Sequence, residues 1–124
     1  MNFVLMMTMT IIDFRTIRQD VSGYFGEGGI IKAYFKESTN VSYKIIYNGN
    51  QSCDEEFERN NRLKLIRVSV ENQTVEVELE DTMEPQIIKL CGAEESNSVS
   101  LEICSVYEGT EYNDTCIAEI ECYR

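Results

Sequence analysis

Acidic side chains are the first candidates for chemistry in this sequence. They form a run at residues 54–58 and an alternating set, Glu76, Glu78 and Glu80. Clustered carboxylates bind Ca²⁺, but the run lacks the Asp-x-Asp-x-Asp-Gly spacing that wraps oxygens around the ion. Glycoside hydrolysis needs two carboxyl groups facing each other across a cleft, whereas glutamates at every second strand position form a single outward row. Neither group therefore predicts a metal site or a catalytic site.

Tyrosines are the second candidates, because an aromatic ring with a hydroxyl at its tip suits binding pockets and interfaces. Tyr34, Tyr43 and Tyr107 fall on expected strands, and we predict that they contribute to a ligand-binding surface. Tyrosine is also an ordinary strand residue. The alternative that these rings only pack on a sheet stays open.

The sequence contains no histidine, which removes several classes of enzyme. A Ser-His-Asp triad, a Cys-His pair and any His-ligated metal site are excluded. An enzyme that uses paired carboxylates is the least favoured remaining class. We therefore predict a protein that is not an enzyme and has no catalytic residue, metal or cofactor.

The charge of the chain restricts its partners. Eleven Lys and Arg stand against 22 Asp and Glu, which gives a net charge of −11. Such a surface repels phosphate, so we expect no nucleic acid and no anionic membrane as a partner. A small-molecule ligand or a basic protein remains.

Five cysteines are candidates for disulfides: Cys53, Cys91, Cys104, Cys116 and Cys122. None are spaced as C-x-x-C, which argues against a zinc knuckle or a redox motif. Cys116 and Cys122 would lie about 20 Å apart on one extended strand, and a disulfide needs Cα atoms within about 7 Å. We predict that Cys104 bonds either Cys116 or Cys122, with five reduced thiols as the alternative.

Asparagine sequons favour an oxidising compartment. Four N-x-[ST] motifs lie in expected loops or at loop edges, and they begin at Asn40, Asn50, Asn72 and Asn113. A glycan on such a motif needs an exposed loop in a secreted protein. We predict that the protein is extracellular, with these four asparagines as candidate glycosylation sites.

The N-terminal segment leaves two interpretations open. Residues 1–12 include an apolar run with the length of a signal-peptide core, but it lacks a basic start and a clear cleavage site. The run is also rich in strand-forming residues. We favour a leader, with a first strand as the alternative, followed by a single β-rich domain over residues 13–124.

Apolar spacing predicts one helix and a series of strands. Residues 13–25 place Phe14, Ile17, Val21 and Tyr24 at helical spacing. Later segments favour strands, and they cover residues 30–36, 41–47, 63–70, 75–80, 86–91, 99–107 and 116–123. Residues 30–36 and 41–47 read as one hairpin, and residues 51–61 as a polar loop. The sequence predicts a mostly β fold, an antiparallel meander in a small barrel or sandwich, with one short N-terminal helix.

The next predicted hairpin joins residues 63–70 to residues 75–80, with Val70 opposite Val75 and Asn72 at its tip. In residues 75–80, valine and leucine alternate with glutamate, which predicts one buried and one wet face. The last strand is expected to point Cys116, Ala118, Ile120 and Cys122 inward.

Two short stretches resemble salivary lipocalins of blood-feeding ticks. They are the segment CSVY at residues 104–107 followed by CIAE at residues 116–119, and the expected helix with the strand over residues 30–35. The resemblance implies a cup-shaped barrel that sequesters a small mediator or a host protein.

These patterns favour a secreted, non-enzymatic binding protein that sequesters a small ligand or a host protein. The alternative is a virus- or phage-encoded protein of the host-cell cytoplasm, or a virion component. Its negative surface would mimic nucleic acid or inhibit a basic partner.

Overall fold

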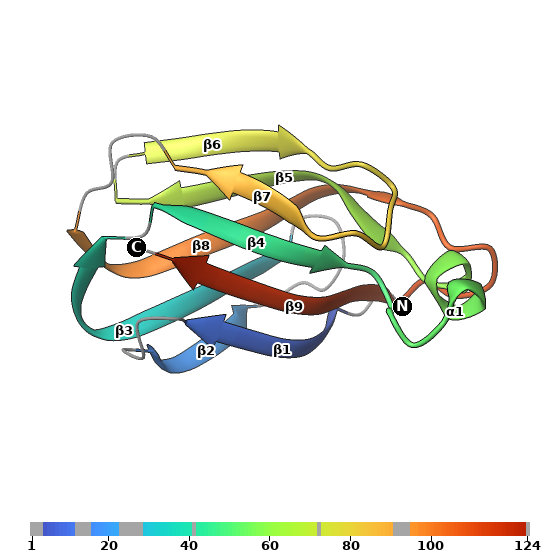
Figure 1. Cartoon of the computed structure of the whole chain (residues 1–124), viewed down its shortest axis with the longest axis horizontal. Coiled ribbons are helices and arrows are strands. Elements are labelled where there is room, and N and C mark those ends of the chain that lie inside the picture. Colours follow the sequence, from blue (N-terminus) through green and yellow to red (C-terminus); the bar gives the residue numbers. More distant parts are fainter. Residues whose placement is uncertain are drawn as a thin grey trace.

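The computed structural model describes residues 4–11, 16–22, 29–40, 42–71, 73–90 and 95–123. These residues form two β-sheets stacked face to face, with one short helix at an end of the stack (Figure 1). The elements are β1 (Val4–Ile11), β2 (Thr16–Ser22), β3 (Ile30–Asn40), β4 (Tyr43–Asn48), α1 (Asp54–Arg59), β5 (Arg62–Val70), β6 (Gln73–Glu78), β7 (Gln86–Lys89), β8 (Glu95–Tyr107) and β9 (Thr115–Tyr123). The predicted mostly β class is confirmed, and the architecture is the sandwich.

The order of the strands shows how the chain builds the two layers. One sheet has the order β1-β9-β4-β7 and the other β2-β3-β8-β5-β6. Among these strands, only β2–β3 and β5–β6 are neighbours both in sequence and in a sheet. The other connections cross between the sheets, which distinguishes the chain from a simple meander. The predicted hairpin of residues 30–36 with 41–47 is wrong, because β3 and β4 lie in different sheets.

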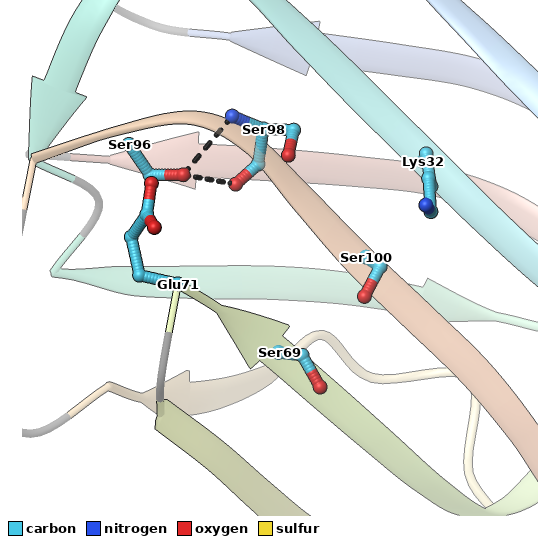
Figure 2. A pocket seen from close by; sticks show the side chains of 6 residues that line it. All are labelled: Lys32, Ser69, Glu71, Ser96, Ser98 and Ser100. Carbon is cyan, nitrogen blue, oxygen red and sulfur yellow. Dashed lines mark hydrogen bonds between the residues drawn. The ribbon is translucent and has the colours of Figure 1, made fainter.

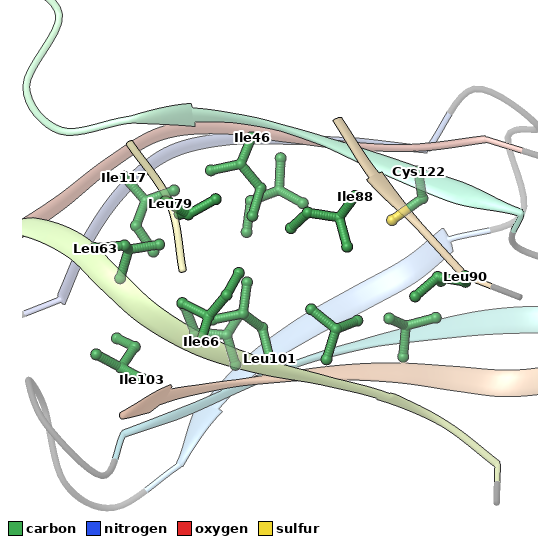
Figure 3. Packing of buried hydrophobic residues seen from close by; sticks show 14 of the residues in the cluster. Ile46, Leu63, Ile66, Leu79, Ile88, Leu90, Leu101, Ile103, Ile117 and Cys122 are labelled. Atoms are coloured by element: carbon green, nitrogen blue, oxygen red, sulfur yellow. The ribbon is translucent and has the colours of Figure 1, made fainter. Parts of the chain in front are cut away.

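The hydrophobic core lies between the two sheets (Figure 3). Ile46, Ile117 and Cys122 enter it from the four-stranded sheet, and Ile66 and Leu101 enter it from the five-stranded sheet. Along β4, and along β5 from Leu65 to Val70, buried residues alternate with half-buried ones. Because successive strand residues point to opposite faces, each strand gives one face to the core and leaves the other at the outer surface.

The β5–β6 hairpin confirms the alternation predicted from the glutamates. Along β6 and the residues after it, the valines and Leu79 turn inward while Glu76 and Glu78 are exposed. The predicted register is wrong by two residues, since Val68 lies opposite Val75, and Val70 lies opposite Gln73. The tip residue, Asn72, lies outside the described residues.

The N-terminal part of the chain differs from the sequence prediction. Thr16–Ser22 forms β2 and pairs antiparallel with β3, so the helix predicted there is wrong. Ile17 and Val21 have helical spacing, but β-branched residues favour strands when a partner strand is available. Val4–Ile11, where the sequence allows either a leader or a strand, forms β1 and pairs parallel with β9.

The helix of the described chain lies instead where a polar loop was predicted. In α1 the first turn is acidic, the last turn carries Arg59, and Phe57 is buried. Acidic residues near a helix N-terminus and a basic residue near its C-terminus both favour the helix dipole. No helix in the described residues has the length and hydropathy needed to span a membrane.

Strand β9 contains an irregularity that changes which residues reach the core. The pairing of β4 with β9 shifts between Tyr47 and Asn48. As a result Ile117 joins Ile120 and Cys122 in the core, whereas Ala118 is only half-buried. Of the predicted inward set, Cys116, Ile120 and Cys122 are buried, and only Ala118 is not. A bulge at this place accounts for the difference.

The predicted bond between Cys104 and Cys116 or Cys122 is absent, because all three thiols are free. Cys104 lies on β8 of the five-stranded sheet, whereas Cys116 and Cys122 lie on β9 of the other sheet. Cys104 directly follows the core residue Ile103, so it belongs to the opposite, outer face of its strand. Cys53 is also free, and Cys91 lies outside the described residues.

Two buried polar side chains make hydrogen bonds near α1, one between the sheets and one from β5 to the segment between β6 and β7. The Asn48 side-chain amide donates to the Leu63 carbonyl at 2.8 Å, and its oxygen accepts from the Leu63 N–H at 2.8 Å. Arg62 donates to both carboxylate oxygens of Asp81, at 2.9 and 2.7 Å, and its guanidinium lies 5.1 Å from the centre of the Phe57 ring. These contacts fix that end of the sandwich.

Candidate ligand-binding site

A hollow of about 250 Å³ opens on the outer face of the five-stranded sheet (Figure 2). Six residues line it: three from β8, one from β3, one from β5 and one from the turn that follows β5. They are Lys32, Ser96, Ser98, Ser100, Ser69 and Glu71. All six side chains are polar, so the hollow is lined with hydrogen-bonding groups.

The sequence explains why the sheet is hollowed at this place. Serines occupy alternate positions of β8 at Ser96, Ser98 and Ser100. Ser100 lies opposite Lys32 on one side and opposite Ser69 on the other, so these three form a row across the sheet. Serine side chains are short, and the longer side chains of Lys32 and Glu71 rise at the margins. None of these residues was predicted as a site residue, although the pattern S-x-S-x-S is visible in the sequence.

The hydroxyl groups of the hollow differ in whether they already have partners. The Ser96 hydroxyl donates to the Ser98 carbonyl at 2.6 Å and accepts from the Ser98 N–H at 3.1 Å. The Ser69 hydroxyl lies 3.1 Å from that of Thr74. The hydroxyls of Ser98 and Ser100 make no hydrogen bond among the described residues. They are therefore available to a ligand.

The charged groups at the margins complete the donor and acceptor set. Lys32 is exposed, and Glu71 is exposed in a turn with a positive φ of 52°. Neither forms an ion pair with another described residue. An ammonium group supplies donors and a carboxylate supplies acceptors, so a ligand in the hollow meets both kinds of group.

The chemistry of the hollow suits binding rather than catalysis. A nucleophilic serine needs an adjacent base, and a lysine base needs burial, but Lys32 is exposed. In the described part of the chain, no three His, Cys, Asp or Glu side chains gather where they could hold a metal ion.

A second surface with unusual composition lies on the outer face of the four-stranded sheet. We call it the tyrosine face, and it consists of Tyr43, Ile45, Tyr47, Ile87, Lys89, Glu119, Glu121 and Tyr123. The rings of Tyr43 and Tyr123 stack with centres 4.7 Å apart and planes 5° from parallel.

Acidic neighbours change the titration of the tyrosine face. The Tyr123 hydroxyl donates to Glu121 at 2.9 Å, and this hydrogen bond, with burial and the nearby negative charge, raises the pKa of Tyr123 to about 12. Burial and the charges of Glu121 and Glu119 raise the pKa of Tyr47. Glu119 and Glu121 therefore act on the same tyrosine and lie on one side of this face.

The three tyrosines predicted to bind a ligand lie in different places. Tyr43 belongs to the tyrosine face. The Tyr107 hydroxyl donates to the Leu79 carbonyl at 2.7 Å, and the Lys64 ammonium lies 5.5 Å from its ring centre, so its contacts are structural. The backbone of Tyr34 pairs with Ser98 at the hollow, and its side chain lies outside the described part. They do not form one site.

The predicted glycosylation sites also have different surroundings. Asn113 is exposed before β9, and Asn50 is half-buried with its side-chain oxygen accepting from the Ser52 N–H at 3.0 Å. Asn40 ends β3, and Asn72 lies outside the described residues. Glycosylation of these sites stays a prediction.

Comparison with known proteins identifies the kind of domain. Residues 7–123 match the family described as NAD glycohydrolase translocation F5/8 type C domain. Comparison with curated protein sequences gives no match. Among solved structures, the translocation domain of the Streptococcus pyogenes NAD⁺-glycohydrolase is similar at a TM-score of 0.62 and 20% identity, over 85% of this chain and 92% of that one.

Two similar structures are carbohydrate-binding modules. The family 32 module of EndoD from Streptococcus pneumoniae has a TM-score of 0.63 and 10% identity, over 88% of this chain and 94% of that one. A family 32 module from Clostridium perfringens, solved in complex with GalNAc-β-1,3-galactose, has a TM-score of 0.55 and 15% identity, over 86% and 75%. These likenesses show the fold.

The predicted resemblance to tick lipocalins is wrong. A lipocalin is a single sheet closed into a barrel, whereas the described strands form two separate sheets that stack as in the similar structures. The alternative of a virus- or phage-encoded protein finds no support in these comparisons. Because the match extends over residues 7–123, the chain belongs to the NAD glycohydrolase translocation F5/8 type C domain family.

Proposed function

We propose that this domain is a non-catalytic binding module that holds a carbohydrate in the hollow formed by β3, β5 and β8. The observation that carries the proposal is the group of Ser69, Ser98 and Ser100, which we call the serine row. The Ser98 and Ser100 hydroxyls in it have no partner among the described residues. A sugar presents hydroxyls that both donate and accept, and serine hydroxyls match them in both roles.

The size of the hollow limits the ligand. Pockets for drug-sized ligands have volumes of about 300–1,000 Å³, and this one has about 250 Å³. It fits one sugar ring better than a longer segment. Because the lining is polar and open to water, each hydrogen bond to the ligand replaces one to solvent and contributes only about 1 kcal/mol. We expect weak affinity for a single sugar.

The comparisons add support of two kinds. The similar module from Clostridium perfringens was solved with GalNAc-β-1,3-galactose, and the module from Streptococcus pneumoniae is named for carbohydrate binding. The description of the family names the translocation of an NAD glycohydrolase. Translocation agrees with a protein that acts outside the cell in which it is made. We therefore propose an extracellular location, as the sequons also suggest.

The test is calorimetric titration of the domain with a panel of monosaccharides that begins with N-acetylgalactosamine. Ser100→Val removes a hydroxyl from the middle of the row and preserves strand propensity. We expect this variant to lose about fivefold or more in affinity, the equivalent of one hydrogen bond. The matched control is Ser105→Val, which lies on the same strand outside the hollow.

The two variants separate the proposal from a general effect on folding. Reduced binding by Ser100→Val with unchanged binding by Ser105→Val supports the hollow as the site. Equal effects of both variants, or binding that neither variant changes, would exclude it. Absence of binding to every sugar in the panel would reject the carbohydrate itself.

A further inference from the structure

The tyrosine face carries apolar side chains that are not part of the hydrophobic core. Ile87 is 63% exposed on β7, the strand at the end of its sheet, and it lies opposite Ile45. Ile45 has Glu121 opposite it on its other side. Neighbouring large apolar side chains on an outer sheet face, with polar residues around them, are typical of interaction surfaces.

The aromatic residues of this face have the composition of an interface centre. Tyr43 and Tyr123 are held rigidly by stacking, and Tyr47 lies opposite Glu119. Tyrosine supplies a large contact area and loses little conformational entropy on binding, so it is enriched where binding energy is concentrated. The face therefore has an apolar centre that is already ordered in the free domain.

Charge decides which occupant this face fits. Glu119 and Glu121 lie on β9, the strand that also carries Tyr123, and Lys89 lies on β7, on the other side of β4. The whole chain carries a net charge of −11, so two copies repel each other when they approach. A neutral sugar presents mainly hydroxyl groups, which do not match the exposed aliphatic side chain of Ile87. A protein surface rich in arginine meets both the aromatic rings and the carboxylates.

We propose that the tyrosine face docks a basic protein surface, with arginine side chains placed over the tyrosine rings and against Glu119 and Glu121. A guanidinium group stacks on aromatic rings and pairs with carboxylates, so one side chain satisfies both parts of the face. Ile87 and Ile45 supply the apolar contact beside it. This surface lies on the sheet opposite the hollow, so a ligand in the hollow and this partner can be bound at the same time.

The test uses a short synthetic peptide in which arginine alternates with leucine, titrated into the ¹⁵N-labelled domain. Two peptides of the same length replace arginine with glutamine or with glutamate. We expect the arginine peptide alone to bind, to shift amide signals of β4, β7 and β9, and to bind more weakly as salt is added.

Paired variants connect the binding to the face. Ile87→Ser is expected to weaken binding about fivefold or more, whereas Tyr112→Ser, which changes the exposed tyrosine of the loop before β9, leaves it unchanged. Glu121→Gln keeps an acceptor for the Tyr123 hydroxyl and removes the charge. Its control is Glu78→Gln, an exposed glutamate on β6 of the other sheet.

The outcomes are distinct. Shifts confined to β4, β7 and β9 that Ile87→Ser and Glu121→Gln both weaken support the proposal. The proposal would be overturned if all three peptides bind, or if the shifts fall on β8 and β3. It would also be overturned if no peptide binds up to about 1 mM, or if the domain self-associates through this face. None of these results depends on whether the hollow binds a sugar.

Discussion

Replacement of Lys44 by methionine should stabilise the domain. Lys44 points into the sandwich between the two sheets, where it is only 1% exposed and lies opposite Cys122 on β9. None of the ion pairs among the described residues includes it. Burial lowers the pKa of Lys44, and the negative charge of a Cys122 thiolate would raise it by a smaller amount.

The magnitude follows from the cost of burying an ammonium group. Replacing a buried ion pair by apolar side chains of similar volume is neutral or stabilising by about 1–4 kcal/mol, and we expect a gain in this range for Lys44, which has no ion-pair partner to lose. For a domain of this size, we expect Lys44→Met to raise the melting temperature by about 4 °C for each kcal/mol. Lys89→Met is the control, because Lys89 is exposed on the neighbouring strand β7 and its replacement should change stability by less than about 0.5 kcal/mol.

The pH dependence of this gain identifies its cause. In the unfolded chain Lys44 holds its proton up to the ordinary pKa of 10.5, and in the folded protein it loses the proton at a lower pH. Between these two values the unfolded state binds more protons, so the wild-type protein becomes more stable as pH rises. The advantage of Lys44→Met is therefore largest at low pH and shrinks as pH approaches 10.5.

Thermal unfolding followed by circular dichroism at several pH values measures this difference directly. Other groups that titrate over the same range are present in both proteins and contribute equally to first order. A Lys44→Met protein that is less stable than the wild type, or a gain that does not change with pH, would show that Lys44 is solvated or paired in the folded domain.

Three further predictions concern single side chains. Asn48→Ala leaves the buried N–H and C=O of Leu63 without their partners, and urea titration should show a loss of about 2–5 kcal/mol; a loss below about 1 kcal/mol would mean that water replaces the amide. Gly49→Ala should be strongly destabilising, because Gly49 has a φ of +77° and an added Cβ would lie 2.6 Å from the Phe57 ring; an unchanged melting temperature would contradict that geometry. Burial raises the pKa of Cys116 to about 11, whereas Cys53 is exposed. Alkylation of the native protein at neutral pH should therefore label Cys53 rapidly and Cys116 only after unfolding. Equal labelling of the two cysteines, measured by peptide mass spectrometry, would refute this.

The sequence predicts best those features that depend on neighbouring residues. Alternation of valine with glutamate over residues 75–80 correctly assigns the faces of β6, because side chains of a strand point to opposite sides in turn. The strands around Ile66 and Leu101 follow from their apolar pattern for the same reason.

Features that depend on distant partners are predicted poorly. The backbone of β2 pairs with β3, and this pairing overrides the helical spacing of Ile17 and Val21. The crossing of β3 into β4 of the other sheet leaves no local signal. The polar, turn-like residues 37–40 therefore favour a hairpin, whereas in the structure they form the end of β3. In α1, the acidic first turn and Arg59 are a local signal for a helix, but the polar composition favours a loop.

The hollow could be predicted only in part. Serines at alternate positions of β8 are visible in the sequence, and their spacing already places them on one face of a strand. Lys32 and Ser69 join them only through the pairing of β3 and β5 with β8, which no local pattern shows. The same holds for the tyrosine face, where the stacking of Tyr43 on Tyr123 brings together the two ends of a long segment of the chain.

Chemical-shift mapping of the ¹⁵N-labelled domain, with the sugar that binds in calorimetry, locates the carbohydrate site without any substitution. We predict that the amide signals of Lys32, Ser69, Ser98 and Ser100 shift together and saturate with one affinity, while those of β4 and β9 stay in place. Shifts centred on the loops beside α1 or on the tyrosine face, with the signals of the serine row unmoved, would contradict a binding site in the hollow.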